Sequence, residues 1–388
     1  MSVFPQNQKH VHFHNLDVLR FIAAFMIVIV HGYFAVIGWE GLPAPIRKDN
    51  SITFPTDENM NSFGLWLKMF VQNLDLGVEF FFLISGFLIT FLMLSEIQLA
   101  GRLDVGKFYM RRLLRIWPLY FFIIAITPLL AAWTKSEEPS YWWNILFANN
   151  YKTILTKNYE PGLAHYWSIC VEEHFYIVWP ILLYFVPTKK LPQLFVSIIF
   201  IAIASRVYFY YTSTEWYNHA KLNTLSRMDT MAIGGWIAWL AFYKPFTFNV
   251  PAWIRILVYI TFAFCFCVDP NHESGDVFML AFKRFIYTGF FAFILVNYLF
   301  NPTAWFNFKK KNILHYLGKI SFGIYMYHNI LFPVIIQKIV WKFHLEGFWI
   351  FWAIYIPIVL IISVLSYELF EKHVLKLKDR FAIVKTTR

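Results

Sequence analysis

The chain has 388 residues, of which 59% are hydrophobic and 21% aromatic, and its formal net charge is +11 at pH 7. Soluble domains are about 45–50% apolar, so this composition excludes an ordinary soluble protein and indicates a polytopic membrane protein. In a soluble chain such a charge would suggest nucleic-acid binding. Here the basic residues follow the segments between apolar runs, and we expect no nucleic-acid partner.

Apolar runs of about 20 residues predict ten transmembrane helices, and hence an all-α helix bundle surrounded by membrane lipid. In chain order the runs cover residues 16–37, 72–95, 117–134, 166–186, 194–212, 222–243, 252–268, 278–300, 313–340 and 347–370. With the N-terminus inside, the cytoplasmic segments hold more than twice as many Lys and Arg residues as the opposite ones. This asymmetry predicts that both termini of the multi-pass protein lie in the cytoplasm. The membrane itself is expected to be the bacterial cytoplasmic (inner) membrane.

The same pattern predicts one integral domain over residues 16–371. A short cytoplasmic tail of residues 1–15 precedes it, and a basic cytoplasmic tail of residues 372–388 follows it. No segment between the runs is long enough to hold a soluble domain.

The first predicted helix carries two ionisable residues, Arg20 and His31, inside its apolar run. Such groups cost on the order of 3 kcal/mol at mid-membrane depth, so chains seldom keep them without a use. Their spacing places both side chains on one helix face, about 16 Å apart along the axis. Asp17 lies on the same face and can hold the guanidinium of Arg20. The alternative is an arginine that reaches the headgroups and a histidine hydrogen-bonded within the bundle.

Glu172, in the fourth predicted helix, is expected at the depth of His31, because each lies about six residues from the outer end of its run. A carboxylate that faces an imidazole orients one ring nitrogen, and acyl transfer uses this pair of base and orienting group. Arg227 and Asp229 add two charges in the outer half of the sixth predicted helix, and we expect these groups to converge on one another or on a wet cavity. A purely structural cluster of salt bridges is the alternative.

Three arginines, Arg111, Arg112 and Arg115, lie within about one helical turn near the inner surface. Joined by Arg20, they could clamp the phosphates of a cytosolic donor through bidentate contacts. A helix held at the membrane surface by anionic lipid explains the same basic residues equally well. The spacing leaves both interpretations open.

Several short motifs occur in a fixed order between residues 16 and 371. They are Asp17-x-x-Arg20, Arg20-x10-His31, Gly77-Val-Glu79 with Ser85-Gly86-Phe87, Arg112-x-x-Arg115-Ile-Trp-Pro118-x-Tyr120, Trp167-Ser168-x-x-x-Glu172, Arg227-x-Asp229, Leu317-Gly318-x-x-Ser321-Phe-x-x-Tyr325-x-x-His328 and Glu371. Together they make the chain resemble the membrane-bound acyltransferase-3 family. Two positions depart from the family pattern: Glu79 stands where many members have Asp, and His373 stands where Pro is common.

The resemblance implies transfer of an acyl group, usually acetyl, from cytosolic acyl-CoA to a hydroxyl of a cell-surface or lipid-linked carbohydrate of the exopolysaccharide or lipopolysaccharide type. It makes His31 the catalytic histidine and gives donor binding to Arg20, Arg112 and Arg115. The matching depth adds Glu172 as the orienting group, and the helical spacing adds Arg111 to the donor side. The donor-binding residues are Arg20, Arg111, Arg112 and Arg115. Supporting or acceptor-side roles are expected for Asp17, Glu79, Ser85, Trp167, Ser168, Arg227, Asp229, Tyr325 and His328.

No metal and no permanently bound cofactor is expected, and acyl-CoA, in the form of acetyl-CoA, is the co-substrate. Because no extracellular hydrolase-like domain is appended, we expect the protein to act alone, as a homo-oligomer or with a separately encoded partner. Direct transfer and an acyl-histidine intermediate both stay open. One alternative is a transporter or flippase of a lipid-linked glycan or small molecule, with the buried charges as a proton relay. Another is an acyltransferase whose acceptor is a small molecule.

Overall fold

The computed structural model describes residues 13–37, 62–160, 162–244, 248–268, 276–301, 303–305, 312–345 and 347–384. Most of the predicted N-terminal tail and the last four residues of the predicted C-terminal tail lie outside the described residues. Within the described ranges the chain is helical and forms no strand, which confirms the predicted all-α class.

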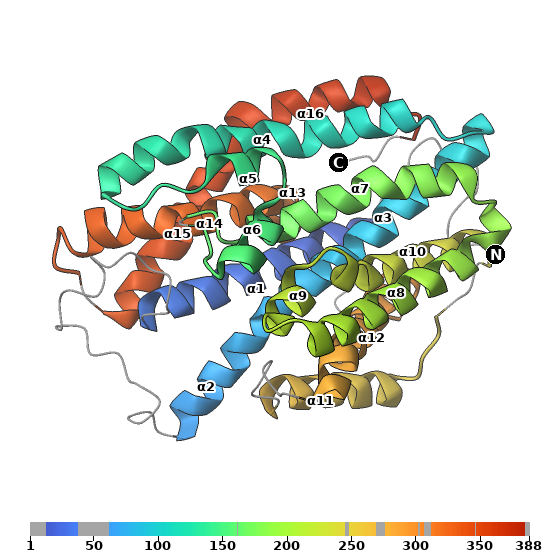
Figure 1. Cartoon of the computed structure of the whole chain (residues 1–388), viewed down its shortest axis with the longest axis horizontal. Helices are drawn as coiled ribbons and strands as arrows, with labels where there is room; N and C mark the ends of the chain where they lie inside the picture. The colour runs from blue at the N-terminus through green and yellow to red at the C-terminus, as the bar shows by residue number, and fades with distance from the viewer. Residues whose placement is uncertain are drawn as a thin grey trace.

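Long helices run roughly alongside one another in Figure 1, and short helices join them. In chain order the α-helices are α1 (His14–Ile37), α2 (Ser62–Gln72), α3 (Gly77–Ala100), α4 (Val105–Thr134), α5 (Tyr141–Ile145), α6 (Asn149–Thr156), α7 (Tyr166–Phe185), α8 (Leu191–Thr212), α9 (Trp216–Leu222), α10 (Met228–Tyr243), α11 (Ala252–Val268), α12 (Val277–Phe300), α13 (Ile313–Lys319), α14 (Ser321–Ile335), α15 (Phe348–Ser366) and α16 (Lys372–Lys378). The short 3₁₀ helices η3 (Asn73–Leu76) and η5 (Leu225–Arg227) lead into α3 and α10.

The number of membrane spans is not confirmed, although each predicted apolar run overlaps a helix. Among the described residues, six helices are long and apolar enough to cross a membrane, and the count becomes seven if the bent pair α13 and α14 is one span. Helix α11 is apolar but shorter. The ten predicted runs therefore correspond to helices, but length and composition qualify only some of them as complete spans.

Helix α3 lies in the interior of the bundle, because it is apolar around its whole circumference. Of its most apolar stretch, 83% is buried inside the protein, against 17% for the segment that contains α8. Helix α3 packs most extensively against α10 and also contacts α1 and α12. It therefore sets the positions of the helices that line the site.

Two glycines allow α3 and α10 to cross at backbone contact. A β-carbon at Gly86 would overlap the backbone of Met231, and one at Gly234 would overlap the backbone of Leu83. Small residues at a helix crossing let the two backbones approach closely, as is common between membrane helices. We expect any larger residue at either position to push the two helices apart.

A bend between α13 and α14 places α14 along α1. The two short helices meet at 67°, and both pack against α1. Gly318 of α13 lies directly against the backbone of Asp17, so a β-carbon there would overlap it. This arrangement brings Tyr325 and His328 of α14 to the part of α1 that carries His31.

Helix α4 carries the arginine motif and begins at a capped end. The carboxylate of Asp104 accepts the backbone N–H of Lys107 at 3.0 Å, which satisfies one of the free amide groups at the helix start. Arg112 and Arg115 follow within the next three turns. Helix α4 packs against α7, α14 and α16, and in its first half Phe108, Ile116 and Leu119 are buried.

Candidate active site

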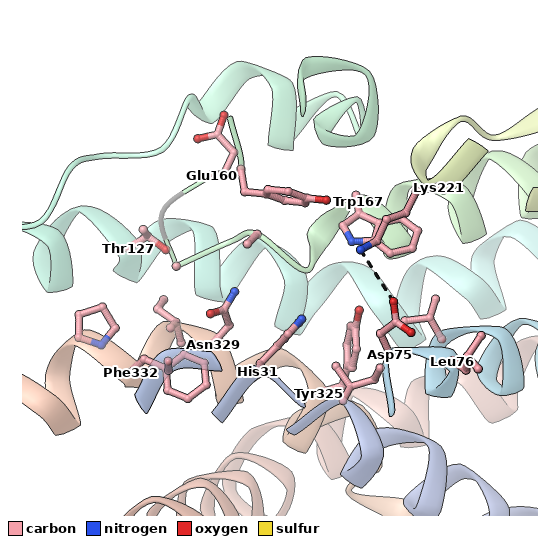
Figure 2. A pocket seen from close by; sticks show the side chains of 18 of the residues that line it. His31, Asp75, Leu76, Thr127, Glu160, Trp167, Lys221, Tyr325, Asn329 and Phe332 are labelled. Carbon is pink, nitrogen blue, oxygen red and sulfur yellow. Dashed lines mark ion pairs between the residues drawn. The ribbon is translucent and has the colours of Figure 1, made fainter. Parts of the chain in front are cut away.

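Two cavities lie next to each other inside the helix bundle. We call the larger one, with a volume of about 160 Å³ and His31 in its lining, the histidine cavity (Figure 2). We call the smaller one, with a volume of about 70 Å³ and Arg20 and Arg112 in its lining, the arginine cavity. Val78 and Tyr325 line both, so the two cavities share a wall.

His31 is held by His328. Nδ1 of His31 lies 2.8 Å from Nε2 of His328, and Nδ1 of His328 lies 2.5 Å from the carbonyl oxygen of Tyr325. A carbonyl can only accept, so a neutral His328 donates from Nδ1 and carries its lone pair on Nε2. His31 then donates from Nδ1 and carries its own lone pair on Nε2. This network assigns to His31 the tautomer in which Nε2 can act as a base.

A third histidine, His165, belongs to the same cluster and was missed by the sequence analysis. Its ring centroid lies 4.7 Å from that of His328, and its Nδ1 lies 3.3 Å from the amide nitrogen of Asn329. Its Nε2 is buried and has no hydrogen-bond partner among the described residues. His165 precedes α7, where no helical periodicity marks it; its nearness to Trp167 and Ser168 is the one signal in the sequence.

The predicted pairing of Glu172 with His31 is wrong. In the part of the chain that the structure describes, Ser85 donates to Oε1 of Glu172 at 2.6 Å, and Tyr176 donates to Oγ of Ser85 at 3.2 Å. Glu172 lines the arginine cavity, whereas His31 lines the histidine cavity. The prediction assumed that α7 starts at the membrane surface. The segment before it instead folds into the bundle, where Leu163 is fully buried, so Glu172 lies deeper than expected.

The arginine cavity collects basic side chains from two helices. Arg20 of α1 meets Arg112 and Arg115 of α4 in its lining. The guanidinium of Arg20 lies 3.8 Å from the carboxylate of Asp17, so these two side chains share a helix face as the spacing predicts. The guanidinium of Arg112 lies 5.5 Å from the ring centroid of Tyr176, and its buried Nε has no hydrogen-bond partner among the described groups. Converging guanidinium groups are suited to bind phosphate.

Arg111 points elsewhere, which corrects its predicted grouping with the other arginines. It forms an ion pair with Glu96 at 2.7 Å and donates to the carbonyl oxygen of Phe381 at 2.8 Å. Among the described residues, Arg112 lines the arginine cavity and Arg111 does not. Consecutive residues of a helix are about 100° apart, so neighbours in sequence face different partners. The contacts of Arg111 attach the C-terminal segment to α4.

Glu79, Trp167 and Arg227 line the histidine cavity together. Glu79 and Arg227 form a buried ion pair at 2.5 Å, and Thr230 donates to Glu79 at 3.1 Å. The ring centroid of Trp167 lies 5.2 Å from the guanidinium of Arg227. These contacts fix one wall of the cavity.

Asp229 is separated from this group. Its carboxylate pairs with Arg206 at 2.8 Å, and both side chains are buried. Arg206 also donates to the carbonyl oxygens of Ser226 and Ala281. This buried pair and its further hydrogen bonds tie α8, α10 and α12 together, which fits a structural role.

A pair of hydroxyl groups lies in the wall between the cavities. Oγ of Ser168 lies 2.5 Å from the hydroxyl oxygen of Tyr325, which donates to the carbonyl oxygen of His165 at 3.1 Å. Ser85 and Ser168 both line the arginine cavity. The hydroxyl of Ser85 is thus held by Glu172, and that of Ser168 by Tyr325.

The fold and the cavities together define a multi-pass helical membrane protein in which a cluster of arginines lies beside a half-buried imidazole. The family model described as an acyltransferase domain matches residues 13–368. Because this match covers most of the chain, the protein belongs to that family, the one that its motifs indicated.

Two proteins of Staphylococcus aureus show how far the similarity extends. O-acetyltransferase OatA of strain NCTC 8325 is 26% identical over 294 residues, which cover 67% of this chain and 46% of OatA. SACOL0978 of strain COL, provisionally named an O-acetyltransferase, is 27% identical over 332 residues, which cover 76% of this chain and 52% of that protein. The chain thus spans about half the length of the curated relatives it matches. No solved structure matches it.

Proposed function

We propose that the protein is a membrane O-acyltransferase that moves an acyl group, acetyl in the simplest case, from cytosolic acyl-CoA to a hydroxyl of a cell-surface or lipid-linked carbohydrate. The observation that carries this proposal is the shared wall of Val78 and Tyr325, because a cluster of arginines, a residue type suited to phosphate, lies on one side of it and the cavity lined by His31 on the other. The names of the staphylococcal relatives support the reaction class.

The donor occupies the arginine cavity in this proposal. The phosphates of CoA bind Arg20, Arg112 and Arg115, because planar guanidinium groups form paired hydrogen bonds with phosphate oxygens. The flexible thioester arm then extends past Tyr325 to His31. An offset of about 16 Å along α1 separates the two ends, and this matches the need to keep a bulky, charged head away from the reacting carbon.

His31 performs the proton transfer. Its Nε2 takes the proton of the acceptor hydroxyl while the hydroxyl oxygen attacks the thioester carbonyl carbon. The carbon–sulfur bond breaks, the acyl group stays on the acceptor oxygen, and the CoA thiolate takes the proton from the imidazolium. In the second route, Nε2 itself attacks the thioester carbonyl carbon and expels the CoA thiolate. The acceptor hydroxyl oxygen then attacks the acyl carbon, the bond from Nε2 to that carbon breaks, and the hydroxyl proton goes to the thiolate. Both routes need the lone pair on Nε2.

Two neighbours support this step in different ways. His328 orients His31 through the 2.8 Å hydrogen bond between their rings, which is the role first expected of Glu172. Glu172 instead holds Ser85 in the arginine cavity, where its charge balances part of the charge on the arginines. In this proposal Glu172 therefore lies on the donor side of the site, and His31 lies on the acceptor side.

The orientation in the membrane belongs to the proposal as well. The excess of Lys and Arg in alternate segments favours the inner membrane with both termini in the cytoplasm. The arginine cavity lies towards the start of α1 and so faces the cytosolic donor. A reporter fused after Arg388 should be cytoplasmic, and one inserted near Lys152 should be external. The reverse result would place the donor and the acceptor at the wrong cavities.

An acyl-transfer assay tests the reaction. Purified full-length protein, reconstituted in lipid with isolated envelope glycans, is given acetyl-CoA labelled in the acetyl group. We expect free CoA thiol and labelled glycan to appear in equal amounts. The matched control is His373→Ala, which removes an exposed imidazole of α16 and should leave both products unchanged. Glycan movement without release of CoA would reject the enzyme in favour of a transporter.

A further inference from the structure

One wall of the histidine cavity carries several charged side chains that the proposed proton transfer does not use. Residues of η3, α3, α9, η5 and α12 meet there. They comprise the cations Lys221, Arg227, Lys283 and Arg284 and the carboxylates Asp75 and Glu79. The sequence analysis missed most of them, because Lys221 and Asp75 lie at the edges of the predicted runs, where charged residues are ordinary.

Among the described residues of this wall, cations outnumber carboxylates. Glu79 lies between Arg227, at 2.5 Å, and Arg284, at 3.7 Å. Asp75 lies 3.8 Å from Lys221. Three of the four cations, Lys221, Arg227 and Arg284, therefore share two carboxylates. In a cavity of low dielectric such a surplus is costly unless an anion binds there.

The neighbouring carboxylates that the structure describes do not remove this surplus. Asp229 is bonded to Arg206 at 2.8 Å. Glu160 lines another part of the cavity and pairs with Lys152 at 3.0 Å. Each of these acids has its own cation, and Glu137, which also lines the cavity, is solvent-exposed.

Two of the three cations can reach a ligand. The side chains of Arg227 and Glu79 are 4% and 3% exposed, so this pair is part of the protein interior. Those of Lys221 and Arg284 are each 20% exposed. The 3.8 Å between Lys221 and Asp75 exceeds the roughly 2.7–2.9 Å of a charge-assisted hydrogen bond. The ammonium group of Lys221 can therefore donate to a further acceptor in the cavity.

This charged wall lies in the same cavity as His31, the proposed base. Figure 2 shows Lys221 and Asp75 pointing toward each other beside Trp167, with His31 further along the same cavity. Aromatic rings are suited to contact the apolar face of a sugar, and the guanidinium of Arg227 holds the Trp167 ring in place. One ligand could thus place an anionic group at Lys221 and a hydroxyl at His31.

We propose that the acceptor is an acidic glycan, in which a carboxylate or phosphate group on the sugar binds Lys221 and Arg284 and thereby aligns a nearby hydroxyl with Nε2 of His31. The inference rests on the proposed function for the acylation step. The binding step is independent of that function and can be measured without any transfer.

Ligand-dependent thermal unfolding of the purified, full-length protein measures this binding. The probes are methyl β-D-glucuronide for a carboxylate, glucose 1-phosphate for a phosphate, and methyl β-D-glucoside as the neutral reference, all at equal ionic strength. We expect one or both anionic probes to bind at least about tenfold more tightly than the neutral one, because a hydrogen bond to a charged group contributes about 1.5–3 kcal/mol. The probe that binds identifies the anionic group.

Substitutions in the charged wall test which side chains bind the anionic group of the probe. Lys221→Met should bring the ratio of affinities close to one, Lys221→Arg should keep it, and Arg284→Gln should reduce it. Lys342→Met, the same change at an exposed position outside the cavity lining, should leave the ratio unchanged. Equal binding of all probes, or an unchanged ratio in Lys221→Met, would overturn the inference. Charge-selective binding in a protein that releases no CoA would instead refute only the proposed function.

Discussion

The arginine cavity and the histidine cavity use charge in different ways. The smaller one, about 70 Å³, gathers three arginines around one carboxylate, Glu172, among the described residues of its lining. The larger one, about 160 Å³, mixes cations with carboxylates and contains the imidazole of His31. A strong local surplus of positive charge suits the phosphates of a nucleotide-like donor. A larger, mixed lining suits a polar acceptor that must also meet a base.

The hydrogen bond that the structure shows for His31 extends this comparison. His328 is a neutral partner in the assigned tautomer and fixes Nδ1 of His31 as the donor. A carboxylate in the same place would favour the imidazolium, which has no lone pair on Nε2. Glu172 lies instead in the arginine cavity. The two cavities thus share a wall, with Glu172 lining one and His31 the other.

Loss of the base should have the largest effect. We expect His31→Ala to lower the turnover number by at least about 10³-fold, because a positioned general base contributes on the order of 10²–10⁴. The Michaelis constant for acyl-CoA should change little, since the arginines stay in place. Steady-state kinetics of purified protein would measure both. If His31→Ala still acylates near the wild-type rate, His31 is not the general base or the acyl carrier.

Loss of His328, which orients His31, should have the second-largest effect on the turnover number. His328→Leu removes the acceptor of the Nδ1 proton of His31, so we expect the turnover number to fall by about 10²-fold. In His328→Gln the amide oxygen can take the place of Nε2, and the loss should be less than about tenfold. Both variants should unfold at similar temperatures in detergent. If they lose activity equally, His328 acts through packing and not through its hydrogen bond.

The donor arginines should affect binding more than turnover. Arg112→Ala with Arg115→Ala should raise the Michaelis constant for acyl-CoA by at least about tenfold. Replacement of both by Lys should restore it only in part, because an ammonium group cannot form paired hydrogen bonds. Arg111→Ala is the matched control: it breaks the pair with Glu96, so it should lower the unfolding temperature and leave the Michaelis constant unchanged. A larger kinetic effect from Arg111 would reverse the assignment.

The smallest expected effect tests whether the cavities act separately. Glu172→Gln keeps a hydrogen bond to Ser85 but removes the charge, and we expect a reduction of the turnover number of about tenfold or less. Combined with His328→Leu, the two losses should add in free energy to within about 0.5 kcal/mol, as expected for sites without a shared partner. Strong coupling between the two would show that Glu172 acts on His31 after all.

The sequence by itself determined what depends on local spacing and on composition. The apolar runs predicted the all-α membrane fold, and the ordered motifs predicted the acyltransferase family. The spacing within α1 correctly placed Asp17 on the same face as Arg20. Such contacts follow from helical periodicity, because residues three or four apart always lie on one face.

Only the tertiary structure decided which helices meet and at what depth. The length of an apolar run limits how long a helix can be, but it does not show at what depth the helix starts. Because the segment before α7 is buried in the bundle, Glu172 lies deeper than the apolar run suggested and does not face His31. The sequence also does not show how each helix is rotated about its own axis. The rotation of α4 directs Arg111 to an ion pair with Glu96 and Arg112 into the lining of the arginine cavity. The pairing of His31 with His328 depends on the bend between α13 and α14 and on the contact of Gly318 with α1. These features arise from packing between distant segments, which no local pattern records.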